Sequence, residues 1–284
     1  MNFNELCKEV SLYPEKYYLF QYINDNEFCF TVLDIEKIQY LVFKRFVFDP
    51  EKDIYINIEK IINKEELLNK NFAKRYLLVS STKSTLIPAL FFSEKDIKTY
   101  FQFVHQLSDY DELNYTFVPS IRSYNVFSIN SELINLLNKN QKSIVFHSNH
   151  VTIETIMQVI NKNDCIYTYF NNNILEVALK ERNELRYFNQ FVLIDNSDFL
   201  YYIKLIYEQL KIGSENLNFF YSGNSSYEQS IIKYINSYFK KPLIVEINWP
   251  EVNEKIGEDI KYKYFNLLYL YNCELLVENI KEEY

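Results

Sequence analysis

The sequence predicts an α/β protein built from two copies of one unit, each a mixed β-sheet with helices on its faces. Two observations predict this fold class. A stretch near the N-terminus is matched, without a gap, by a second stretch 147 residues further on, and a repeat of this kind sets the architecture of a whole chain. In both stretches apolar residues alternate as in half-buried strands, and segments with helical periodicity follow.

Each copy of the repeat begins with three strands joined by two turns. The first turn is rich in Asn, the residue other than Gly that best tolerates the positive φ of hairpins. Identical residues of the two copies are Tyr22 and Tyr169, Asn24 and Asn171, Asn26 and Asn173, and Tyr40 and Tyr187. The predicted strands are 18–23, 27–33 and 38–48 in the first copy, with turns at 24–26 and 34–37, and 165–170, 174–180 and 185–194 in the second, with turns at 171–173 and 181–184.

Each copy continues with a helix, a strand, a Ser-rich loop and a late strand followed by a helix. Such crossover connections place helices on the faces of a sheet. The first copy also has an insertion near 85–140, with a helix at 93–107 and a strand-like stretch at 115–129. We predict a first subdomain at 1–162 and a second at 163–284. The matched segments are helices 57–70 and 196–212, strands 76–80 and 217–221, loops 80–84 and 222–226, and late strands 142–149 and 241–248.

Two such units in tandem are the plan of the actin-like ATPase fold, which joins two ribonuclease-H-like subdomains with mixed five-stranded sheets. From YYLF at 17 through YYIK at 201, the chain also resembles an uncharacterised Bacteroidota family with a degenerate form of this fold. None of the matching stretches is a catalytic signature, so the resemblance implies a fold and no reaction. These stretches are LIPALFF at 86–92, YNVFSIN at 124–130, FHSNH at 146–150 and NQFVLIDNSDFLYYI at 189–203.

The resemblance implies a nucleotide site between the halves, of which the sequence keeps little. In this fold the turn after each first strand wraps the phosphates, and a Gly-rich loop covers the adenosine. Gly suits such loops because backbone N–H groups must approach the phosphate closely. Neither turn contains Gly, and hairpin chemistry alone is the simpler interpretation of both. The vestigial nucleotide-binding candidates are Asp25, the only acid in the turns, with Asn26, Asn171, Asn172, Gly223 and Asn224.

Composition argues against several classes of protein. A net charge of −8 argues against nucleic acid as a ligand, since binding to phosphate backbones needs clustered cations. No apolar run reaches the ~20 residues of a membrane span, and the N-terminus has no signal-peptide pattern, so we expect a cytoplasmic protein without a membrane span. The four Cys residues have no metal-ligand spacing, and we interpret them as buried apolar groups.

Two further patterns could carry chemistry but are not predicted to do so. His147, His150 and Glu154 would have to share one helix face to bind a metal, whereas a strand is predicted to end between the two histidines. The loop SSTKST at 80–85 contains Lys and Thr but lacks the GxxxxGK of a phosphate-binding loop. We predict no catalytic residue and no metal site.

Three hypotheses for the function follow. The leading one is a non-catalytic scaffold or protein-interaction module, without cofactors, that has lost the phosphate-binding loops and binds an unknown protein partner. The alternative is a nucleotide-binding switch or sugar-kinase-like enzyme that holds ATP and magnesium with Asp25 and the loop at Gly223. The third is a ribonuclease-H-type nuclease, for which Asp25, Asp34 and Asp195 would have to converge on metal ions. The aromatic-rich stretch 261–276 must be covered by the chain itself or by a partner.

Overall fold

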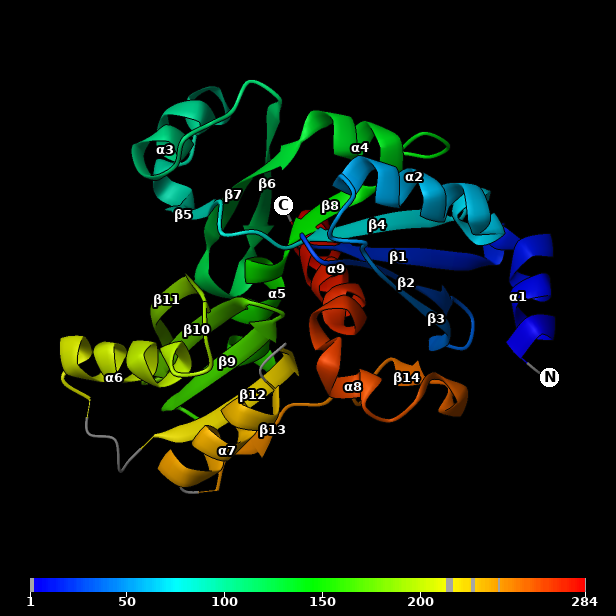
Figure 1. The fold of residues 1–284 in the computed structure, drawn as a ribbon. Coiled ribbons are helices and arrows are strands. Elements are labelled where there is room, and N and C mark those ends of the chain that lie inside the picture. Colours follow the sequence, from blue (N-terminus) through cyan, green and yellow to red (C-terminus); the bar gives the residue numbers. More distant parts are fainter. Residues whose placement is uncertain (1–2, 213–216, 226–227, 240, 284) are drawn as a thin grey trace.

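The computed structural model describes residues 3–212, 217–225, 228–239 and 241–283. Two large sheets lie on either side of a central helix, and a smaller sheet lies above the second one in Figure 1. Helices cover the faces of both large sheets. The predicted α/β class, with two tandem mixed sheets, is therefore confirmed.

The two large sheets repeat one strand order. The first is β3-β2-β1-β4-β8, with β14 added beside β3, and the second is β11-β10-β9-β12-β13. In each, the first three strands are antiparallel and the later two are parallel to the first. The strands are β1 (Tyr17–Ile23), β2 (Glu27–Asp34), β3 (Gln39–Val47), β4 (Lys74–Val79), β8 (Ile144–His147), β9 (Cys165–Asn171), β10 (Ile174–Glu181), β11 (Glu184–Val192), β12 (Asn218–Asn224), β13 (Leu243–Ile244) and β14 (Glu251–Val252).

A pair of irregularities shows how closely the copies match. The pairing of β2 with β3 shifts between Val32 and Leu33, and the pairing of β10 with β11 shifts between Leu179 and Lys180. These positions are 147 residues apart, which is the separation of the sequence repeat. A bulge kinks and twists a strand locally, so both sheets bend at the same place.

Three hydrophobic cores hold the layers together. One lies between the first sheet and the helices on its outer face, and another lies between the second sheet and its outer helices. The third lies between the two sheets, where α5 and α9 pack. The helices are α1 (Phe3–Leu12), α2 (Ile54–Lys64) and α4 (Ser131–Leu137) on the first sheet, α6 (Asp198–Leu210) and α7 (Glu228–Tyr238) on the second, α3 (Ile97–Val104) in the insertion, and α5 (Ser148–Glu154), α8 (Ile260–Lys263) and α9 (Phe265–Glu283).

The insertion forms the third sheet, in the order β5-β7-β6. Its strands are β5 (Ser84–Pro88), β6 (Asp111–Val118) and β7 (Ser123–Asn130). The single strand-like stretch predicted at 115–129 was wrong, because a short 3₁₀ turn at Pro119–Ile121 divides it into two antiparallel strands. The helix predicted at 93–107 is the shorter α3, preceded by a 3₁₀ turn.

The predicted late strand at 241–248 was also too long, and no helix follows it directly. Only Leu243 and Ile244 pair with β12, at the edge of the sheet. The helix predicted at 57–70 ends at Lys64 and continues as a 3₁₀ turn at Glu66–Asn69. Both errors concern element ends, which local sequence patterns define poorly.

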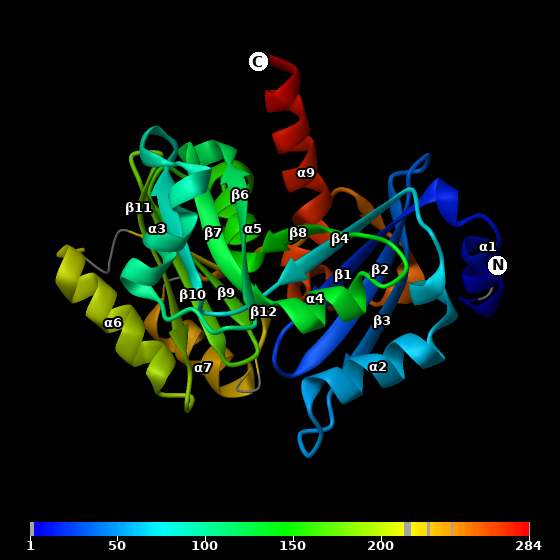
Figure 2. The ribbon, with the colours of Figure 1, turned by 90° about the horizontal axis from the view of Figure 1, so that it is seen from above.

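The C-terminal segment returns from the second sheet to the first. Glu251 and Val252 pair in parallel with Gln39 and Tyr40 of β3. The helix α9 then runs between the two halves (Figure 2), where it contacts β1, β12 and α5. The aromatic-rich stretch 261–276 is therefore covered by the chain itself. The boundary between 1–162 and 163–284 stays a prediction, because residues beyond 250 contribute to the first sheet as well.

Within the ranges that the structure describes, none of the helices has both the length and the apolar character needed to span a bilayer.

Candidate functional site

The two turns that occupy the phosphate-loop positions of the actin-like fold contact each other. Asn24 Nδ2 donates a hydrogen bond of 2.8 Å to Asn171 Oδ1, and these are equivalent residues of the repeat. Tyr22 completes the cluster, because its hydroxyl donates to Asn171 Oδ1 and accepts from Asn24 Nδ2 at 2.7 Å. All three side chains are buried. Side chains of the protein thus join the two turns that would wrap the phosphates.

Three backbone N–H groups at the turns are also engaged. A phosphate nest needs successive N–H groups that point at the ligand. In the first turn, the N–H groups of Asn26 and Glu27 donate to Asn24 Oδ1 at 2.8 and 2.9 Å. In the second turn, Asn172, at a φ of +56°, donates its N–H to the carbonyl oxygen of Asn224 at 2.7 Å. The first two donors stabilise the turn between β1 and β2, and the third joins the second turn to the end of β12.

The remaining candidates are placed in two groups. Asp25 and Asn26 are exposed at the tip of the first turn. Asn224 lies opposite Asn171, where β12 pairs with β9, and Gly223 lies opposite Phe170 in the same ladder. The structure thus brings Asn171, Asn172, Gly223 and Asn224 together at one end of the second sheet. It joins this group to the first turn through Asn24 and Tyr22.

Gly223 has a structural reason to be glycine. Its φ is +99°, and a Cβ at this position would lie 2.1 Å from the carbonyl oxygen of Phe170. The absence of a side chain lets β12 approach β9, so close approach of a nucleotide is not needed to explain this residue. The cavity beside Gly223 measures about 40 Å³ and is walled largely by Ile231, Ile235 and Ile244. Ligand pockets usually measure several hundred Å³, so the cavity that the described residues form here is too small for adenosine.

Burial also controls the protonation of the cluster. It raises the pKa of Tyr22 well above the usual range of tyrosine. The same is true of Tyr169, the equivalent residue of the second copy. A protonated Tyr22 hydroxyl is a hydrogen-bond donor, and Asn171 Oδ1 receives it. The cluster is therefore neutral, and it offers no charge to a phosphate.

A second buried polar cluster lies between α5, α9 and the second sheet. Glu176 of β10 is fully buried, and it accepts a hydrogen bond from the Thr152 hydroxyl and another, of 3.3 Å, from Gln190 Nε2. Asn266 Nδ2 of α9 donates to Thr152 Oγ1 and to Ser148 Oγ, both at 2.9 Å. Burial raises the pKa of Glu176 to about 7. This network joins the two halves through uncharged donors.

The possible metal ligands have separate partners. His147 Nε2 lies 3.3 Å from Ser81 Oγ, and His150 Nδ1 lies 3.1 Å from Thr116 Oγ1. Glu154 accepts a hydrogen bond of 3.0 Å from the N–H of Ser120. Burial lowers the pKa of each histidine to about 3. The two histidines are therefore neutral, and the three side chains are held by separate partners.

The three acids of the nuclease hypothesis are also separated. Asp34 ends β2 at the end opposite Asp25, and it accepts hydrogen bonds from the N–H groups of Glu36 and Lys37 at 3.0 Å. Asp195 precedes α6 and accepts from the hydroxyl of Ser197 at 2.6 Å. Each acid organises its own turn. Two-metal chemistry requires carboxylates that share ions about 4 Å apart.

Tyr22 and Asn24 were missing from the predicted site residues. The signal was present, because both are identical to their equivalents in the second copy. Identical Asn residues at two equivalent turns indicate, by themselves, only hairpin chemistry. Contact between the two turns depends on how the halves are oriented, and a repeat does not specify this.

The fold is that of the actin-like ATPases, and in this chain the turns at 24–26 and 171–173 are joined by a hydrogen bond between Asn24 and Asn171. A solved structure from Bacteroides thetaiotaomicron VPI-5482, described as having an actin-like ATPase fold and unknown function, is similar over 94% of this chain and 98% of its own, with a TM-score of 0.75 and 15% identity. A PilM-PilN type IV pilus biogenesis complex is similar over 93% of this chain and 98% of that chain, with a TM-score of 0.61 and 9% identity.

Residues 9–241 match the family described as "Protein of unknown function (DUF3822)", and the chain belongs to this family. A search of curated proteins finds no match. The family and the solved structures together agree with the resemblance inferred from the sequence, and they assign no reaction.

Contact between the turns can be tested by a double-mutant cycle on Asn24→Ala and Asn171→Ala. We expect a coupling energy of about 1 kcal/mol, because each variant removes one partner of the same buried hydrogen bond. The measurement is the free energy of unfolding from denaturant titrations of the four proteins. The control pairs Asn24→Ala with Asn69→Ala, since Asn69 lies near the other end of β1, about 20 Å away by strand geometry. Additive effects in the first cycle would contradict the contact.

Proposed function

We propose that the protein is a cytoplasmic, non-catalytic member of the actin-like fold that acts through contacts with another protein. The observation that supports this is the Tyr22, Asn24 and Asn171 cluster, which joins the two phosphate turns by side-chain hydrogen bonds. The N–H groups of Asn26, Glu27 and Asn172 at the turns are already bonded within the protein. A nucleotide would have to break these bonds and separate the two turns.

The fold is compatible with such a role. One of the similar solved structures is a PilM-PilN complex in type IV pilus biogenesis, in which a chain of similar fold is present with another protein. This likeness concerns the fold only. Function belongs to sites rather than to folds, so the proposal for this chain depends on its own turns and surfaces.

Nucleotide binding provides the test. We expect the melting temperature to change by less than 1 °C when 5 mM Mg-ATP or Mg-ADP is added. A ligand present at 100 times its dissociation constant stabilises a protein by about 2.7 kcal/mol, which would raise the melting temperature of a chain of this size by several degrees. Asn171→Gly, which removes the bridging side chain, is the matched variant. A shift with the unmodified protein would favour the nucleotide-binding alternative and refute our proposal.

A further inference from the structure

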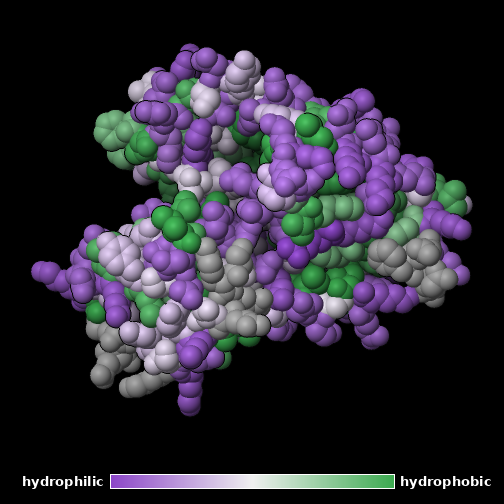
Figure 3. Space-filling view, viewed as in Figure 1, coloured by the Kyte–Doolittle hydropathy of each residue, from purple (hydrophilic) through white to green (hydrophobic). Residues whose placement is uncertain are grey.

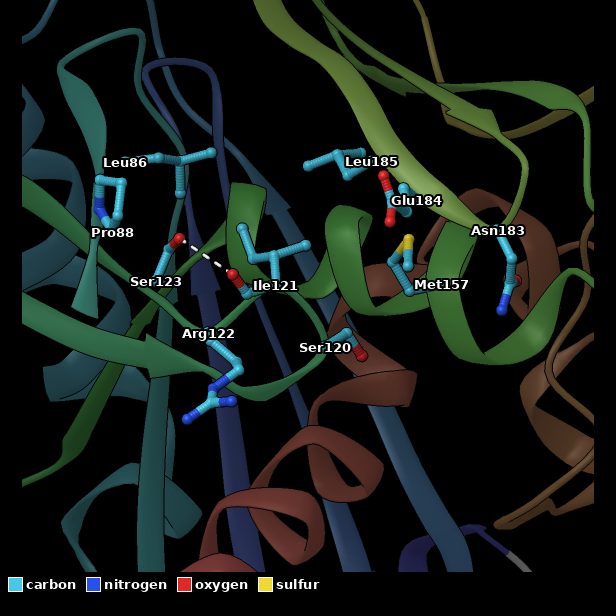
Figure 4. Close-up of a pocket in the computed structure, with 10 residues that line it drawn as sticks. All are labelled: Leu86, Pro88, Ser120, Ile121, Arg122, Ser123, Met157, Asn183, Glu184 and Leu185. Atoms are coloured by element: carbon cyan, nitrogen blue, oxygen red, sulfur yellow. Dashed lines mark hydrogen bonds between the residues drawn. The ribbon is translucent and has the colours of Figure 1, made fainter. Parts of the chain in front are cut away.

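A groove runs between the insertion and the second sheet. Two neighbouring pockets form it, of about 450 and 390 Å³, and Leu86 lines both. Figure 4 shows Leu86 and Pro88 of β5 on one wall of the larger pocket and Leu185 on the opposite wall. The space-filling view shows the surface notched between these two parts of the molecule (Figure 3). Each pocket falls in the usual size range for ligand sites.

Both walls of the groove are edge strands. β5 is at the edge of the insertion sheet, and β11 is at the edge of the second large sheet. The smaller pocket pairs Ser84 and Leu86 with Phe188 and Gln190, whereas the larger one pairs Pro88 with Leu185. The strands therefore run antiparallel along the groove. An edge strand presents unpaired N–H and C=O groups and is a template for a further strand.

The hydrogen-bond pattern shows which groups of β5 face the groove. Ser128 donates its N–H to Lys83, and Ala89 donates to Arg122, at the two ends of the ladder with β7. Residues alternate between bonded and unbonded positions in an antiparallel pair. Odd-numbered residues of β5 thus bond to β7, and Leu86 directs its N–H and C=O to the other side. The neighbouring carbonyl of Ser84 is already used, because it lies 2.8 Å from His105 Nε2.

The same reasoning applies to β11. Leu193 donates its N–H to Asn173 at the end of the ladder with β10. Even-numbered residues from 188 to 192 therefore face away from β10. The N–H of Gln190 is engaged by Asn189 Oδ1 at 2.9 Å. The N–H and C=O of Phe188 therefore face the groove, across from Leu86. Among the described residues, no backbone hydrogen bond joins β5 to β11.

The side chains of the groove indicate what would fit. Arg122 is exposed at the larger pocket, and no carboxylate of the described residues lies within ion-pair distance of it. Glu184 lines the opposite wall. Val104 lines the smaller pocket with 55% of its surface exposed. An occupant would complement these groups if it had an apolar side chain near Val104, an acidic side chain near Arg122 and a basic side chain near Glu184.

We propose that an extended segment of a partner protein binds between β5 and β11 as an added strand, pairing its backbone with Leu86 and Phe188 and an acidic side chain with Arg122. In such β-augmentation the main chain supplies affinity and the pockets supply specificity. This inference rests on the proposed function, since it places the predicted protein contact in this groove. The groove is bridged at one end, because the Ser84 hydroxyl donates a hydrogen bond of 3.4 Å to Gln190 Oε1. The segment is therefore limited to a few residues between this bridge and the larger pocket.

The test begins with a probe and two variants. The probe is a phage library of random 12-residue peptides, selected on the whole protein, and enriched sequences are then synthesised. Leu86→Pro removes the N–H that faces the groove but leaves the bonds of Thr85 and Ile87 to β7, because proline is tolerated at edge strands. Arg122→Glu reverses the charge. The control is Lys142→Glu, an exposed charge reversal beside β8.

We expect enriched peptides that alternate apolar residues and contain an acidic one, with affinities weakened about tenfold by Leu86→Pro and by Arg122→Glu, as the loss of one strong interaction implies. Lys142→Glu should bind as the unmodified protein does. Hydrogen exchange at the Leu86 amide should slow on binding, and melting curves should show that the variants are folded.

Failure to enrich any peptide, or equal binding by all three variants, would overturn the inference. Peptides that bind every variant equally would leave the proposed function standing with a contact elsewhere. Nucleotide binding in the melting experiment would refute the proposed function whatever the peptides do. The two failures are therefore distinguishable.

Discussion

Gly223→Ala is expected to destabilise the protein by about 4 kcal/mol. The new Cβ would lie 2.1 Å from the carbonyl oxygen of Phe170 and 2.6 Å from its nitrogen, so the two strands must move apart. Overpacking and forbidden backbone geometry each cost about 1–3 kcal/mol. The free energy of unfolding measures the effect, and the melting temperature should fall by about 10 °C.

Gly257→Ala is the matched control for this prediction. Gly257 also has a positive φ, of +89°, but the nearest atom to its added Cβ is Asp259 Oδ1 at 3.4 Å. We expect Gly257→Ala to lower the free energy of unfolding only by the cost of the strained backbone, about 1–2 kcal/mol. Equal losses in the two variants would show that the approach of β12 to β9 is not what requires glycine.

Glu176→Gln is expected to stabilise the protein by about 3 kcal/mol at pH 8 and to leave its stability unchanged below pH 4.5. Burial raises the pKa of the folded-state carboxyl from 4.5 to about 7, and each unit is worth about 1.4 kcal/mol. The folded state then binds the proton more tightly than the unfolded state. The contribution of Glu176 to stability is therefore complete at low pH and is lost as the pH rises from about 4.5 to 7.

Denaturant titrations of both proteins from pH 4.5 to 8 measure this difference. His147 and His150 act in the opposite direction, because their pKa values are lowered and they destabilise the fold as the pH falls, but they are present in both proteins and cancel. Exposed Glu184→Gln serves as the control, with an expected change below about 0.5 kcal/mol. A less stable Glu176→Gln protein at pH 8 would show that the carboxylate is paired when ionised.

Local patterns were sufficient to predict the duplicated sheets. The strands at the start of each copy are short, largely apolar runs bounded by Asn-containing turns, and such runs indicate strands that are buried on both faces, as β1, β2, β9 and β10 are. The prediction of one strand-like stretch at 115–129 was wrong because a local turn interrupts it. Pro119 begins a 3₁₀ turn and Arg122 adopts a φ of +48°, and only Pro119 is visible as a breaker in the sequence.

Contacts between distant segments were not predictable in this way. Asn24 and Asn171 were recognised as equivalent, but their hydrogen bond depends on the angle between the halves. Glu176 reads as one polar position in an apolar strand, and its burial follows from α5 and α9, which come from elsewhere in the chain. The pairing of Glu251 with β3 leaves no periodic signal, because two residues are too few to show one.

The path of α9 has a consequence for biosynthesis. Residues 265–271 fill the core against Phe20, Tyr40 and Tyr76, which leave the ribosome well before them. The Tyr40 hydroxyl bonds to the carbonyl of Leu268 at 2.7 Å. One aromatic face of the N-terminal sheet therefore stays uncovered until about 190 residues beyond Tyr76 have been made. The first sheet of a nascent chain is covered only when α9 has been made. Until then, this sheet is the part of the chain for which a chaperone would be needed.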